Sequence, residues 1–115
     1  MASQYFIGVD IGTAGTKAAI FDLQGNQLAT AYEESKLYCP QVGWVEEKSE
    51  DFYTSTINTI KEVIKKSGVN SRDIASIAFR GQIAGILGIN RDWLEIMVGA
   101  KDLRPCEETC KALRS

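Results

Sequence analysis

The segment from Gly8 to Asp22 constrains this chain most, because it describes two short apolar strands joined by a tight turn. It reads G-V-D-I-G-T-A-G-T-K-A-A-I-F-D, so the first apolar run ends at Asp10 and the second begins after Lys17. A turn rich in glycine and threonine offers backbone N–H groups and hydroxyls without bulky side chains, which suits a phosphate chain. We therefore predict a phosphate-binding hairpin.

The residue types around this turn suit a nucleoside triphosphate and its metal. Asp10 suits hydrated Mg²⁺, which prefers one or two carboxylates plus phosphate oxygens. Lys17 can reach a phosphate as a point charge. A turn-stabilising aspartate is the simpler alternative for Asp10. We predict ATP and Mg²⁺ as ligands, with Asp10 on the metal and five residues on the phosphates: Gly12, Thr13, Gly15, Thr16 and Lys17.

The turn differs from the two commonest nucleotide-binding loops. The chain has no G-x-x-x-x-G-K-[ST] motif, and the spacing of Gly8, Gly12 and Gly15 is not that of G-x-G-x-x-G. Both of those loops lead into a helix. Here the following segment, Lys17–Asp22, is short and apolar and precedes a Gly-Asn turn, so it is typical of a strand.

The remaining pattern predicts a mixed sheet with one helix. Short links indicate antiparallel pairing of the first three strands, and a right-handed crossover after the helix favours a fourth, parallel strand. Helix-favouring signals are an N-cap at Ser49 and a stop at Gly68. The predicted elements are strands Tyr5–Asp10, Lys17–Asp22 and Gln27–Tyr32, helix Ser49–Lys66 and a buried strand Ile74–Phe79.

Three separate motifs resemble the FGGY carbohydrate kinases, in the order found in that family. The first is D-I-G-T at Asp10–Thr13 with Lys17. The second is P-Q-V-G-W-V-E at Pro40–Glu46, and the third is A-F-R-G-Q-I-A-G at Ala78–Gly85. The third is most similar to the xylulokinase-like branch. The resemblance extends from about residue 5 to residue 93.

The resemblance implies an α/β fold, the first lobe of an actin-like (ribonuclease H-like) ATPase, present here in truncated form. The expected segments of this partial N-terminal lobe are a phosphate-binding meander over 1–32, a substrate-side loop over 33–48, helix and strands over 49–90, and an atypical tail over 91–115. We expect the chain to be the front portion of such a kinase.

The resemblance also implies a sugar substrate, with a xylulose-like ketose favoured. Ile83 and Ala84 replace the Arg-Glu pair of glycerol kinases and the Met-His pair of xylulokinases, which disfavours polyol recognition of the glycerol kinase type. For Trp44, a role as a hydrophobic plug is an equal alternative. The implied substrate-binding residues are Trp44, Glu46, Gln82, Ile83 and Asp102, while the segment Gly85–Ile89 is expected to be a core strand.

In this family the catalytic base and the adenine pocket lie in a later part of the chain, so the resemblance assigns no catalytic residue here. The isolated chain is expected to be nearly inactive. The alternative hypothesis is a nucleotide-binding module without transfer activity, since the same hairpin serves regulatory ATPases of the actin-like superfamily. The segments around Trp44 and Gln82 favour the kinase, because a module of that kind does not need them.

Composition excludes several other classes. The formal net charge of −2 with interspersed signs argues against nucleic-acid binding, and no apolar run is long enough to span a membrane. The absence of histidine excludes Ser-His-Asp and Cys-His mechanisms. Three irregularly spaced cysteines, Cys39, Cys106 and Cys110, are typical of reduced thiols in the cytoplasm rather than of a metal site. A homodimer is compatible with the resemblance.

Overall fold

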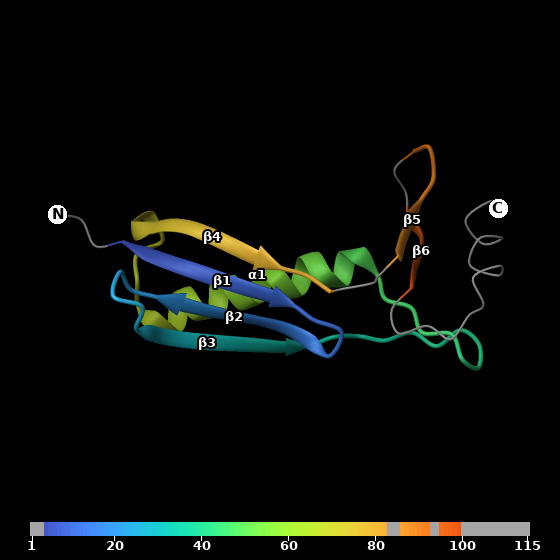
Figure 1. Cartoon of the computed structure of the whole chain (residues 1–115), viewed down its shortest axis with the longest axis horizontal. Coiled ribbons are helices and arrows are strands. Elements are labelled where there is room, and N and C mark those ends of the chain that lie inside the picture. Colours follow the sequence, from blue (N-terminus) through green and yellow to red (C-terminus); the bar gives the residue numbers. More distant parts are fainter. Residues whose placement is uncertain (1–3, 83–85, 93–94, 100–115) are drawn as a thin grey trace. The chain divides into compact units, whose positions relative to one another are not determined.

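The computed structural model describes residues 4–82, 86–92 and 95–99 (Figure 1). The chain divides into two compact units, Met1–Ser35 with Phe52–Gln82 and Lys36–Asp51 with Ile83–Ser115. No described helix is long and apolar enough to cross a membrane. The elements are β1 (Tyr5–Ile11), β2 (Gly15–Phe21), β3 (Gln27–Glu34), α1 (Ser49–Ser67), a 3₁₀ turn η1 (Ser71–Asp73), β4 (Ile74–Arg80), β5 (Ile86–Ile89) and β6 (Glu95–Gly99).

The first unit is built on a four-stranded sheet in the order β3-β2-β1-β4. Strands β1, β2 and β3 form an antiparallel meander, and β4 joins the other edge of β1 in parallel. This topology confirms the mixed sheet predicted from the sequence. The β1–β2 turn lies at the same end of the sheet as the carboxyl ends of β1 and β4 (Figure 1).

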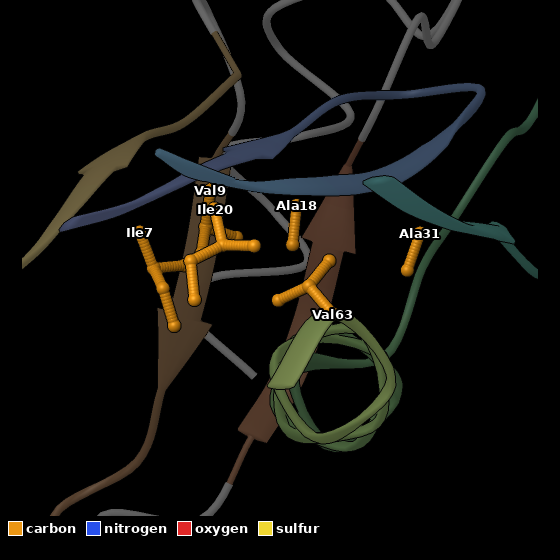
Figure 2. Packing of buried hydrophobic residues seen from close by; sticks show 6 residues of the cluster. All are labelled: Ile7, Val9, Ala18, Ile20, Ala31 and Val63. Atoms are coloured by element: carbon orange, nitrogen blue, oxygen red, sulfur yellow. The ribbon is translucent and has the colours of Figure 1, made fainter. Parts of the chain in front are cut away.

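One face of the sheet forms the hydrophobic core against α1. Side chains alternate between the two faces of a strand, so every second residue of β1 and β2 faces the helix. Six apolar side chains fill the space between sheet and helix (Figure 2). They are Ile7, Val9, Ala18, Ile20, Ala31 and Val63, each at most 4 % exposed.

Helix α1 follows from its sequence at both ends. Its first turn carries Glu50 and Asp51 and its last turn Lys65 and Lys66, which complement the helix dipole. Gly68 adopts a positive φ of 70° and donates its N–H to the carbonyl of Ile64 over 3.1 Å. This geometry confirms the predicted glycine stop.

The prediction that Ile74–Phe79 is a buried strand is wrong in one respect. The strand exists and is parallel to β1, but from Ala75 onward β4 is exposed. Ile77 and Phe79 are 40 % and 60 % exposed, although they are in register with the core residues Ile7 and Val9. The reason is that β4 is an edge strand and the buried cluster is drawn from β1, β2, β3 and α1.

The described part of the second unit contains a two-stranded antiparallel sheet of β5 and β6. Leu87 and Ile89 of β5 are 54 % and 44 % exposed. The expected core strand over 85–89 is therefore present as a hairpin strand with exposed apolar side chains, and residue 85 lies outside the described residues. Apolar composition alone does not distinguish a core strand from a hairpin strand.

Candidate phosphate-binding site

The β1–β2 turn is closed by its own backbone and by the end of β3. The N–H of Gly12 donates to the carbonyl of Gly15 over 3.0 Å. The N–H of Ser35 donates to the Ala14 carbonyl over 3.0 Å, and the Ser35 hydroxyl donates to the Gly12 carbonyl over 3.2 Å. The turn is therefore held from the side of β3 as well as by its own hairpin.

Tyr32 lies against this turn, a contact that sequence reasoning missed. Its hydroxyl donates to the Ala14 carbonyl over 2.9 Å. A Cβ at Gly15 would lie 2.5 Å from three atoms of the Tyr32 side chain, so the ring occupies the space that the glycine leaves free. Gly15 has no positive φ, and close approach rather than conformational freedom explains this glycine. The glycine at position 15 was the one sequence feature that could have indicated a close contact with another side chain here.

Two backbone donors remain at the tip of the turn. Within the described residues, the N–H groups of Thr13 and Ala14 have no hydrogen-bond partner, whereas the N–H of Gly12 is already bonded within the turn. Unpaired N–H groups in succession attract anions. The Gly12 N–H, one of the groups expected to contact phosphate, is thus already used within the turn, and the Thr13 and Ala14 N–H groups are the donors at its tip.

The Thr16 side chain lies on the face of the hairpin that packs against α1. Thr16 is fully buried, and its hydroxyl is 2.9 Å from the hydroxyl of Ser55 on α1. Ser55 in turn donates to the carbonyl of Phe52 over 3.1 Å. This placement differs from the expected contact with phosphate: the Thr16 hydroxyl joins the hairpin to the helix, because residues alternate faces along β2.

Asp10 and Lys17 lie on the exposed face of the sheet. They are directly opposite each other in the β1–β2 pair, and both are exposed. Among the described residues there is no group of three or more His, Cys, Asp or Glu that could hold a metal by itself. An exposed single carboxylate beside free N–H groups fits Mg²⁺, which takes most of its ligands from water and phosphate.

Trp44 and Glu46 belong to the loop between β3 and α1, in the second unit. Backbone bonds of 2.8 Å in both directions pair Tyr38 with Glu46, and the Trp44 N–H donates to the Gln41 carbonyl over 3.1 Å. The Tyr38 hydroxyl donates to Asp51 over 2.8 Å, which raises the pKa of the tyrosine. Both predicted side chains are half-buried on a loop that Tyr38 anchors.

Gln82 follows the carboxyl end of β4 in the first unit and is half-buried. Ile83 and Asp102, the other predicted substrate residues, lie outside the described residues, as do Cys106 and Cys110. Cys39 is an exposed free thiol.

The sequence of this chain is similar to those of known carbohydrate kinases. The model of the FGGY family of carbohydrate kinases, N-terminal domain, matches residues 5–114. A glycerol kinase from Ectopseudomonas mendocina is 39 % identical over 80 residues, which cover 70 % of this chain and 16 % of the relative. The chain thus spans about a sixth of the length of such curated relatives.

Solved structures show the same fold. A gluconate kinase from Lactobacillus acidophilus superposes with a TM-score of 0.78 at 24 % identity, covering 87 % of this chain and 20 % of that one. A xylulose kinase from Rhodospirillum rubrum superposes with a TM-score of 0.78 at 21 % sequence identity, covering 94 % of this chain and 22 % of that one. These likenesses confirm the predicted actin-like ATPase fold. The family match over residues 5–114 shows that this chain belongs to the FGGY family of carbohydrate kinases, as an N-terminal domain sequence.

Proposed function

We propose that this chain supplies the phosphate- and metal-binding part of an ATP-dependent kinase that phosphorylates a sugar hydroxyl. The observation that carries the proposal is the placement of Asp10 and Lys17 opposite each other, beside a turn whose Thr13 and Ala14 N–H groups are free within the described residues. Phosphoryl transfer depends mainly on positioning and on charge stabilisation, and this arrangement supplies both.

Each of these groups has a distinct task in the proposal. Asp10 holds Mg²⁺ directly or through water, and the metal neutralises charge on the phosphate oxygens when it is bound. Lys17 and the two N–H groups donate hydrogen bonds to phosphate oxygens. Tyr32 and the Thr16–Ser55 pair hold the turn without touching the ligand.

A xylulose-like ketose is the proposed substrate. Gln82, at the end of β4, supplies an amide that can bond sugar hydroxyls. Trp44 offers an apolar ring face to a sugar, and Glu46 accepts hydrogen bonds from hydroxyls. The resemblance of the Ala78–Gly85 segment to xylulokinases supports the choice of a ketose over glycerol.

The test is an NMR titration of the full chain with Mg²⁺ and ATP. Without an adenine pocket we expect a dissociation constant near the millimolar level, about −4 kcal/mol. Amide shifts should concentrate on residues 10–17. They should shrink in Asp10→Ala when Mg²⁺ is limiting and in Lys17→Gln at all Mg²⁺ concentrations. Lys61→Gln, which removes an exposed lysine of α1, is the matched control. Scattered shifts, or shifts that Lys17→Gln leaves unchanged, would contradict the proposal.

A further inference from the structure

Arg80 lies beside Asp10 on the side opposite to Lys17. The parallel β1–β4 pair places Asp10 in register with Arg80, and the antiparallel β1–β2 pair places Asp10 in register with Lys17. Side chains that are directly opposite on neighbouring strands share a face, with Cβ atoms about 4.5–5.5 Å apart in antiparallel pairs. The sheet therefore presents a row of cation, carboxylate and cation at the end where its phosphate turn lies.

Neither cation of this row has a partner within the described residues. Lys17 and Arg80 are exposed, and no ion pair or side-chain hydrogen bond joins either of them to Asp10 there. Lys66 shows the contrast, because it contacts Glu62 at 2.8 Å and donates to the Thr30 carbonyl over 3.1 Å. The row carries one net positive charge, which favours a polyanion.

The surface next to the row is open. Gly8 is in register with Ala19 on β2 and with Ala78 on β4. The residues next to the row on the same face of the sheet are therefore small. A Cβ built on Gly8 would meet no atom of the described residues within 4 Å. A ligand on the row can therefore approach the sheet closely without displacing a side chain.

We infer that Arg80 is an anion-binding residue of this site, which receives an oxyanion held beside Asp10. The inference rests on the proposed function and adds a residue to it. A guanidinium presents a planar fork of donors that matches two oxygens of a phosphoryl group or of a carboxylate. Arg80 lies on the Gln82 side of Asp10, so the oxyanion is either the outermost phosphoryl group of the nucleotide or the carboxylate of an acidic sugar.

The test compares Arg80→Gln with Arg72→Gln in the full chain. Arg72 is also an exposed arginine, in η1 at the other end of β4, and is the matched control. The ligands are Mg²⁺ with inorganic tripolyphosphate in one arm and gluconate in the other. We expect Arg80→Gln to weaken binding about tenfold, as for loss of one charge-assisted hydrogen bond. Arg80→Lys should retain part of the affinity, and Arg72→Gln all of it.

The arms and controls separate the outcomes. Weakening with tripolyphosphate identifies a phosphoryl group as the oxyanion, and weakening with gluconate alone identifies a sugar acid. Unchanged binding of both ligands to Arg80→Gln, with weaker tripolyphosphate binding in Lys17→Gln, overturns the role of Arg80 and leaves the proposed function standing. If Asp10→Ala and Lys17→Gln also bind normally, the proposed function fails as well. Thermal unfolding of every variant checks that the fold is retained.

Discussion

The Tyr32 hydroxyl donates a hydrogen bond to the Ala14 carbonyl over 2.9 Å, across the place where Gly15 lacks a side chain. A tyrosine of β3 thereby fixes the tip of the turn that joins β1 to β2, the strand next to β3 in the sheet order. Orienting the Ala14 peptide also orients its neighbours, and the Thr13 and Ala14 N–H groups are the donors proposed for phosphate. The contact between Tyr32 and Gly15 therefore helps to orient the backbone donors of the proposed site.

Gly15→Ala should displace the Tyr32 ring and weaken the turn. The new Cβ would lie 2.5 Å from the ring, and the exposed tyrosine can move away at the loss of its hydrogen bond, about 1 kcal/mol of unfolding free energy. In a Tyr32→Ala background the same substitution should have little further effect, since the obstacle is gone. Chemical denaturation of the four proteins measures this coupling. Additive effects of the two substitutions would show that the glycine is needed for another reason.

Ser55→Ala should destabilise the protein more than Thr16→Val does. The Ser55 hydroxyl donates to the Phe52 carbonyl, so Thr16 is the donor in the bond between the two hydroxyls. Removing Ser55 leaves a buried O–H without a partner, which costs about 1–3 kcal/mol. Thr16→Val removes the donor and leaves Ser55 bonded to Phe52, so its cost should be near zero.

The comparison of Ser55→Ala with Thr16→Val is made by urea unfolding, with Thr54→Ala, at an exposed position on the same helix, as the control. The reverse order of stabilities would mean that the donor assignment is wrong. Both variants should keep Mg²⁺-polyphosphate binding, because the two hydroxyls are buried on the helix side of the sheet.

Stability at low pH should depend on Asp22. Its carboxylate accepts hydrogen bonds from the Asn26 side chain and backbone and from the Gln24 N–H, which lower its pKa below the usual 3.8. A lowered folded-state pKa contributes stability above the unfolded value, and this contribution is lost as pH falls through the folded value. Unfolding measured between about pH 5 and pH 2 should show a smaller acid-dependent loss in Asp22→Asn. An identical acid profile in both proteins would contradict this account.

The chain alone should not phosphorylate sugars. Kinases of this type assemble their site by closing two lobes over the substrate, and the family resemblance places the catalytic base in a later part of the chain. A coupled ADP-release assay with ketoses, polyols and gluconate should therefore stay at background. Sugar-dependent ADP release that co-purifies with the chain and falls in Asp10→Ala would show that this expectation is wrong.

The sequence by itself determined the element order and the topology of the first unit. Short apolar runs bounded by turn residues, short links and the Gly68 stop predicted the meander, the helix and the parallel strand, because these are local rules of backbone geometry. The family also followed from local motifs. Element ends differed by one or two residues, as in β2, which begins at Gly15 because its pairing with β3 extends to Glu34.

Tertiary structure decided which side chains of these elements meet. Thr16 is buried against Ser55, 39 residues away, because the strand register turns its hydroxyl toward α1. The exposure of Phe79 was equally unpredictable, since an apolar pattern states a preference for burial and only the packing of α1 decides which strands are covered. Arg80 became part of the site through its register with Asp10, a relationship between distant residues that no spacing rule along the chain contains.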